Sequence, residues 1–153
     1  MNTSFIMTPE SVAIVEADTK QGILEEMSRL FAESWRLDPA RVLEAIEERE
    51  KLGSTGFGRG VAIPHARYSG LHRPIAALLK LKRPVDFDAA DGMLVDLVFG
   101  LLSPEDSGAM HLHALAELSR MVRDDRVHEA LSEATDAEAI YGLLTNAMDR
   151  DAA

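Results

Sequence analysis

The chain has 153 residues, 46% of them hydrophobic, which predicts one globular domain with a single core. Acidic residues outnumber basic ones 26 to 16, so the net charge of −10 disfavours nucleic acid and favours a partner with a basic face. The absence of cysteine excludes disulfides, a thiol nucleophile and cysteine-ligated metal. Without a long apolar run or a signal-peptide pattern, we expect a cytoplasmic protein and no membrane insertion.

The first half of the chain predicts one short strand and two helices. Residues 12–15 form a β-prone run. A helix is expected over residues 18–34, with Asp18 as the N-cap of a capping box. An Asp-Pro start predicts a second helix over residues 38–52, which Gly53 would end.

The second helix carries an anomaly near its end. Val42, Leu43 and Ile46 form an apolar face whose next members fall at positions 49 and 50. These positions hold Arg49 and Glu50, and isolated charges are costly to bury. We expect the two charges to pair with each other, with water or with something bound beside the following glycine-rich loop. The alternative is that this end of the face simply reaches solvent.

The second half of the chain predicts two apolar strands and then helices only. The expected strands cover residues 75–81 and 93–102, and the expected helices cover residues 109–123, 127–133 and 137–147. The tail over residues 147–153 should fray. Since no internal repeat appears, the pattern predicts helices packed around a small sheet, which is an α/β domain.

A glycine-rich stretch, "GSTGFGRGVAIPHARY" over residues 53–68, leads into a histidine. Four of the ten glycines fall within eight residues here. Pro64 restricts its own backbone and favours an extended residue before it, so His65 should stand on a rigid segment at a strand end. Glycine also lets backbone amides approach an anion closely. The stretch could therefore be a phosphate cradle, a nucleophile platform or merely a turn, with His65 as an ordinary structural histidine.

Two further histidines lie on the helix predicted after the second strand. His111 and His113 are two residues apart, about 200° around a helix, so both rings cannot face one site. His111 borders the expected buried face and can point inward, whereas His113 should be exposed. His111 could equally be a polar residue at a helix start without a role. The expected buried face consists of Leu112, Leu115, Leu118 and Val122.

The sequence lacks the motifs of several common classes of binding site and enzyme. The glycines match neither a Walker loop nor a dinucleotide fingerprint, and no serine nucleophile elbow is present. No zinc-hydrolase motif occurs, so no metal site is predicted. The remaining parts are His65, a second histidine, an arginine and a loop with two hydroxyls. Histidine can act as a covalent nucleophile, and these parts suit a phosphoryl group held on an imidazole nitrogen.

The longest of these motifs, "EEREKLGSTGFGRGVAIPHAR", resembles the signature of enzyme IIA components of the phosphoenolpyruvate-dependent phosphotransferase system. The fructose/mannitol class is the most similar, and within it the nitrogen-regulatory branch. The pieces "PVDFDAADGMLVDLVFGLLSPED" and "HLHALAELSRMVRD" extend the resemblance from Val12 to Asn146. It implies a single domain over residues 1–153, with a core over about 12–146 and a mixed central β-sheet flanked by α-helices. The sequence departs from the family at Ala66-Arg67 and within "RYSGLHRP".

The resemblance also implies a function for individual residues. His65 would accept a phosphoryl group from a small carrier protein of the HPr type, and the ring of His111 would support that group. Arg49 would offset its charge, with Ser54 and Thr55 as weaker candidates for hydrogen bonds to its oxygens. This scheme needs no cofactor and no bound metal.

Three functions remain open from the sequence. The first is a regulatory phosphocarrier whose phosphorylation state controls binding to target proteins. The second is a sugar-specific enzyme IIA that passes phosphate to the IIB domain of a transporter. The third is a binding module that keeps the fold and has lost the transfer.

Overall fold

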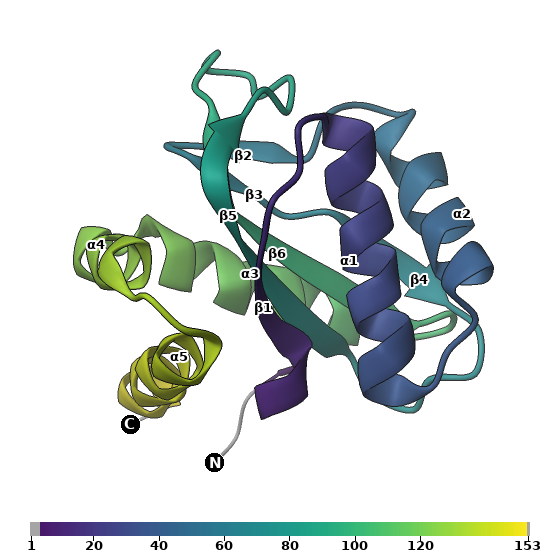
Figure 1. The fold of residues 1–153 in the computed structure, drawn as a ribbon. Helices are drawn as coiled ribbons and strands as arrows, with labels where there is room; N and C mark the ends of the chain where they lie inside the picture. Colours follow the sequence, from purple (N-terminus) through teal and green to yellow (C-terminus); the bar gives the residue numbers. More distant parts are fainter. Residues whose placement is uncertain (1–3, 153) are drawn as a thin grey trace.

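One mixed sheet of six strands lies at the centre of the molecule, with helices on both of its faces (Figure 1). The structure, a computed structural model, describes residues 4–152. The strands are β1 (Val12–Val15), β2 (Gly56–Gly58), β3 (Val61–Ala62), β4 (His65–Tyr68), β5 (Ile75–Val85) and β6 (Val95–Pro104). The helices are the short 3-10 helix η1 (Pro9–Ser11) and α1 (Lys20–Trp35), α2 (Pro39–Glu50), α3 (Ala109–Arg123), α4 (Asp125–Glu133) and α5 (Ala137–Ala152).

Strand β6 is the organising strand of the sheet, whose order is β1-β5-β6-β3-β2. It pairs antiparallel with β5 along one edge. Along its other edge it pairs in parallel first with β3 and then with β4, so these two short strands follow one another beside β6. Strand β1 joins β5 in parallel, and β2 forms an antiparallel pair with β3. The prediction of an α/β domain with a mixed central sheet is therefore confirmed.

Two apolar cores lie on opposite faces of this sheet because side chains alternate along a strand. Leu78 of β5 belongs to the core under α3, α4 and α5, whereas the next residue, Leu79, belongs to the core under α1 and α2. Gly100 of β6 allows α1 to approach closely. A Cβ atom there would lie 2.5 Å from Met27 Sδ and 2.7 Å from the ring of Phe31.

The start of α1 differs from the prediction by one residue. Thr19, not Asp18, is the N-cap, and its Oγ1 accepts a 2.9 Å hydrogen bond from the Gly22 amide. Asp18 lies outside the helix and pairs with Arg83. With glycine at the third helical position, no reciprocal capping box can form, so that prediction was wrong. The predicted Asp-Pro start of α2 is confirmed, with Asp38 as its cap.

One other expectation needs correction. Leu112 is 63% exposed, because the buried face of α3 runs through His111, Ala114 and Leu118. Helix α5 continues to Ala152 and so includes most of the tail over residues 147–153, whose fraying stays a prediction; residue 153 lies outside the described chain. The strand end expected before His65 corresponds to β3, whereas β2 and β4 were not predicted, because each is too brief to show a periodic pattern.

Candidate functional site

His65 is positioned by a break between two short parallel strands. Strand β3 ends at Ala62 and β4 begins at His65, and both pair with β6. The carbonyl of Pro64, between them, accepts a 3.0 Å hydrogen bond from the Leu101 amide. Pro64 itself has no amide hydrogen to offer a ladder, which explains the interruption. His65 therefore stands at the start of β4 rather than at the end of the strand before it.

The imidazole of His65 is half-buried and has a defined orientation. Its Nδ1 lies 2.7 Å from the carbonyl oxygen of Ile63. Because a carbonyl can only accept, Nδ1 carries the ring proton and Nε2 keeps a free lone pair. Burial lowers the pKa of His65, and the hydrogen bond to the Ile63 carbonyl opposes this effect. The charge of Arg49 lowers the pKa further, and Glu50 raises it. The ring is therefore a neutral imidazole near pH 7, with a nucleophilic nitrogen available at Nε2.

His111 lies beside His65, in the first turn of α3. The two ring centroids are 5.7 Å apart, with the planes tilted by 46°. His111 is only 7% exposed, and its Nδ1 lies 2.6 Å from the hydroxyl of Ser103 on β6. Burial lowers its pKa to about 4, helped by the charges of His65 and Arg67. The predicted inward orientation of His111 is confirmed, and His113 is exposed as expected.

Arg49 lies at the end of α2, close enough to His65 for its charge to act on that ring. Its Nη1 donates a 2.9 Å hydrogen bond to the carbonyl of Gly53, which holds the side chain over the start of the glycine-rich loop. Among the described residues no carboxylate lies within ion-pair distance of Arg49. A guanidinium has five N–H donors, so most of them stay available to an anion beside His65.

Glu50 resolves the anomaly of the charged helix end. Its side chain is 6% exposed and forms a 2.9 Å ion pair with Lys20 of α1. It also accepts hydrogen bonds from the amide and the hydroxyl of Thr55. The expected partners were Arg49, water or a bound group, so this internal network is a correction. Lys20 could not have been identified from the local pattern, because it lies thirty positions earlier in the chain.

Both hydroxyls of the loop are used to build it. Ser54 Oγ donates to the carbonyl of Phe87 over 2.9 Å and accepts from the Gly56 amide over 3.0 Å. The hydroxyl of Thr55, which is buried, donates to Glu50. With their protons engaged, neither hydroxyl can donate to a phosphoryl oxygen in this arrangement. Ser54 and Thr55 thus help to build the loop, and their weaker role toward a phosphoryl group stays a prediction.

Three polar residues that the sequence did not indicate belong to the surroundings of His65 and His111. Ser103 contacts His111, and Arg67 of β4 donates a 2.8 Å hydrogen bond to the hydroxyl of Ser107. Arg67 is two residues after His65, and the period of a strand places such residues on the same face. That signal could have been used had β4 been predicted as a strand.

Neither a metal-binding cluster nor a membrane-spanning helix is found among the described residues. Within residues 4–152, no group of three or more His, Cys, Asp or Glu side chains is arranged to hold a metal ion. None of the helices in that range is long and apolar enough to cross a membrane. The candidate site consists of two histidines with lowered pKa values and two arginines whose charges act on them, at one edge of the sheet.

Comparison with known proteins agrees with this fold and arrangement. The family described as "Phosphoenolpyruvate-dependent sugar phosphotransferase system, EIIA 2" matches residues 5–147. A "Nitrogen regulatory protein" of Pseudomonas aeruginosa is 44% identical over 143 residues, covering 92% of this chain and 93% of that protein. The chain therefore belongs to the EIIA 2 family of the phosphotransferase system, as the sequence motifs indicated.

Two further comparisons concern a nitrogen regulatory protein and a fructose-specific component. The crystal structure of Nitrogen Regulatory Protein IIA-Ntr from Neisseria meningitidis superimposes with a TM-score of 0.83 at 37% identity, covering 91% of this chain and 96% of that one. A "PTS system fructose-specific EIIABC component" of Bacillus subtilis is 31% identical over 146 residues, covering 94% of this chain and 23% of that protein. The fold is thus shared with a regulatory protein and with part of a sugar-specific one.

Proposed function

We propose that this protein accepts a phosphoryl group on Nε2 of His65 from a histidine-phosphorylated carrier of the HPr type. The observation that carries the proposal is the 2.7 Å contact between Nδ1 of His65 and the Ile63 carbonyl, which leaves the Nε2 lone pair free. Because the pKa of His65 is lowered, the ring stays unprotonated near pH 7 and the lone pair remains available. Membership of the EIIA 2 family supports the same reaction class.

The transfer is a displacement between two imidazoles. The Nε2 lone pair of His65 forms the new N–P bond in line with the old one. The bond from phosphorus to the carrier's imidazole breaks, and its electron pair stays on the carrier's nitrogen. The phosphorylated His65 ring becomes an imidazolium, whose Nδ1 proton stays hydrogen-bonded to the Ile63 carbonyl. Such a reaction depends mainly on position and on electrostatic stabilisation of the equatorial oxygens.

Two side chains are suited to that stabilisation. Arg49 offers cationic N–H donors next to His65, and charge-assisted hydrogen bonds of this kind are strong. His111 can donate from Nε2 only if its own Nδ1 is an acceptor. The hydroxyl of Ser103, 2.6 Å away, can supply the hydrogen bond that selects this tautomer. We therefore assign Ser103 to positioning the proton of His111. The step requires no cofactor.

Phosphorylation then acts as a signal. A phosphoryl group adds negative charge and three strong acceptor oxygens to the surface around His65, which changes what that surface can bind. The similarity to proteins named as nitrogen regulatory proteins favours target proteins that distinguish the two states. A soluble carrier as donor would also place this protein in the cytoplasm.

The test is direct phosphorylation of the purified protein. It is incubated with phosphoenolpyruvate, enzyme I and an HPr-type carrier, and intact mass and acid lability report the bound phosphate. Wild type should gain one acid-labile phosphoryl group, and His65→Ala should gain none. His113→Ala is the matched control, because His113 is exposed on the same helix as His111 and should behave as wild type. If an active cognate carrier leaves wild type unmodified, the transfer is lost and a binding module is the better interpretation.

A second function, delivery of phosphate to a sugar transporter, is favoured by the similarity to a fructose-specific EIIABC component. In that case His65 would pass its phosphoryl group to a IIB domain. The two functions are distinguished by mixing the phosphorylated protein with a fructose- or mannitol-type IIB domain. Rapid and complete loss of phosphate to IIB would support the sugar-specific function, and retention would support the regulatory one.

A further inference from the structure

Arg67 is a cation of the candidate site to which neither the sequence motifs nor the comparisons give a role. It lies two residues after His65 on β4, so both side chains leave the strand on the same face, on the order of 7 Å apart along it. Its register partner on β6 is Ser103, and the register partner of His65 is Leu101. Leu101 belongs to the core under α3, so His65 and Arg67 both face the helix that carries His111.

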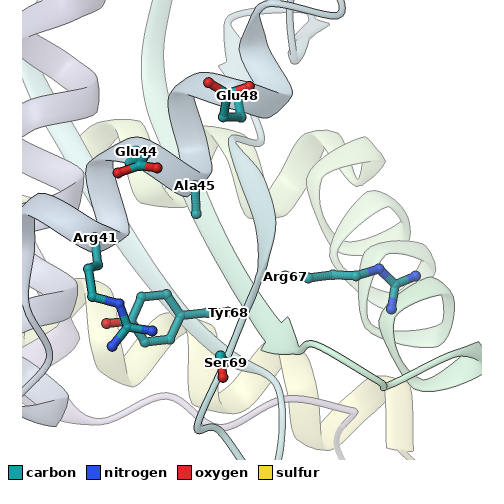
Figure 2. Close-up of a pocket in the computed structure, with 7 residues that line it drawn as sticks. All are labelled: Arg41, Glu44, Ala45, Glu48, Arg67, Tyr68 and Ser69. Carbon is teal, nitrogen blue, oxygen red and sulfur yellow. The ribbon is translucent and has the colours of Figure 1, made fainter.

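Figure 2 shows how the arginine is directed. Arg67 lines, with Arg41, Tyr68 and other residues, a pocket of about 270 Å³ between α2 and β4. Its guanidinium leaves β4 on the side away from Arg41 and Tyr68 (Figure 2). Arg41 instead lies over the ring of Tyr68, 4.7 Å from its centroid. The side chains of the two arginines thus lie on opposite sides of β4 (Figure 2).

The guanidinium of Arg67 is held in place but is not neutralised. Nη1 donates to Ser107, in the loop before α3, over 2.8 Å. No carboxylate among the described residues lies within ion-pair distance of it. Its charge acts on His111, whose ring centroid is 5.7 Å from that of His65. One anchored N–H leaves four donors, in a fixed planar arrangement that matches phosphoryl oxygens.

The geometry points to Arg67 as a second phosphoryl-binding arginine, which contacts the group on His65 from the α3 side while Arg49 contacts it from the α2 side. This inference rests on the proposed phosphorylation of His65. It deepens that function by adding a residue that determines how strongly the phosphorylated state is favoured.

The experiment measures the equilibrium of transfer between the phosphorylated carrier and this protein. At equilibrium, the ratio of phosphorylated to free forms depends on how well each protein stabilises the phosphoryl group. It does not depend on how well the two proteins dock, because docking changes only the rate. Intact mass spectrometry of both proteins gives this ratio for wild type, Arg67→Ala, Arg67→Lys and the control Arg41→Ala.

Arg67→Ala should lower the equilibrium constant about fivefold, as expected for one partly solvated charge-assisted hydrogen bond. Arg67→Lys should recover part of the loss, and Arg41→Ala should leave the constant unchanged. In ³¹P NMR, the pKa of the phosphoryl group should rise in Arg67→Ala, because a cation near it has been removed. A slower rate with an unchanged constant and an unchanged phosphoryl pKa would make Arg67 a docking residue and overturn the inference. If wild type itself takes up no phosphate, the proposed function fails first.

Discussion

Two polar clusters lie on either side of the His65 segment. They are built from similar residues but differ in whether their charged and hydrogen-bonding groups already have partners. In the first, between α1, α2 and the glycine-rich loop, Lys20, Glu50 and Thr55 use their charges and hydrogen bonds on one another. In the second, between β4 and α3, His65 keeps an unused lone pair and Arg67 keeps unused donors. A closed network stabilises a loop, whereas an open one can bind a further group.

The difference shows what the sequence alone does not reveal about part of the site. Ser54 and Thr55 stand next to the glycines, where hydroxyls could contact an anion, yet the closed network uses both. Arg67 stands in a segment that looked like a departure from the family, yet its charge acts on His111. A residue's contribution here depends on whether its hydrogen bonds are already made, which only the folded structure determines.

The largest effect on stability is expected in the closed cluster. Replacing Glu50 with Ala leaves the Lys20 ammonium and the Thr55 amide without their partner, and should lower the free energy of unfolding by about 2 to 3 kcal/mol. Lys20 is still partly exposed, which keeps the loss below that of a fully buried pair. Urea denaturation gives the value. The double variant Lys20→Met/Glu50→Gln should recover part of it, and equal destabilisation in the single and double variants would contradict a coupled pair.

The open cluster should instead make stability depend on pH. The pKa of His111 falls from 6.5 to about 4 in the fold, mainly by burial, so the unfolded chain binds this proton more readily. The neutral His111 ring makes its full contribution to the free energy of unfolding above about pH 6.5. This contribution is lost as the pH falls toward about 4. The lowered pKa of His65 acts in the same direction. Thermal unfolding measured from pH 8 to 5 should show the decline.

Two glutamine variants test whether the His111 ring causes this pH dependence of stability. In His111→Gln the decline in melting temperature below pH 6.5 should become shallower, since a titrating buried group has been removed. His113→Gln, which changes an exposed residue on the same helix, should keep the wild-type slope. Identical slopes in all three proteins would mean that burial of His111 does not govern the acid sensitivity.

A smaller effect is expected from the hydroxyl that contacts His111. Ser103→Ala leaves the Nδ1 atom of a buried ring without a partner and should lower the free energy of unfolding by about 1 to 2 kcal/mol. The more specific result concerns the tautomer. In ¹⁵N NMR of the wild type, the proton of His111 should reside on Nε2, and in Ser103→Ala this preference should weaken. Ser103→Thr, which keeps a hydroxyl, should restore it, and a proton on Nδ1 in wild type would exclude the proposed positioning.

Much of the architecture was predictable because it depends on local signals. The Asp-Pro start of α2 and the bounds of α3 are encoded by neighbours in the chain, and both agree with the structure. Strands β3 and β4 were not predictable in this way. They are strands because β6, more than thirty residues later, pairs with them. The contact between His65 and His111 spans forty-six positions and was implied only by the family resemblance.

Arg49 is shared between the two clusters, because it belongs to α2 while its charge acts on His65. A variant of Arg49 shows to which cluster it contributes more. Its hydrogen bond to Gly53 is exposed, so Arg49→Ala should change the free energy of unfolding by only about 0.5 kcal/mol. Phosphoryl transfer to His65 should nevertheless slow markedly, because one of the two cations beside the group is gone. Rapid mixing with phosphorylated carrier measures the rate, and Arg49→Lys should fall between the two. Normal transfer in a clearly destabilised Arg49→Ala would instead assign this arginine to the loop, and the site would then depend on Arg67 and His111 for its positive and donor groups.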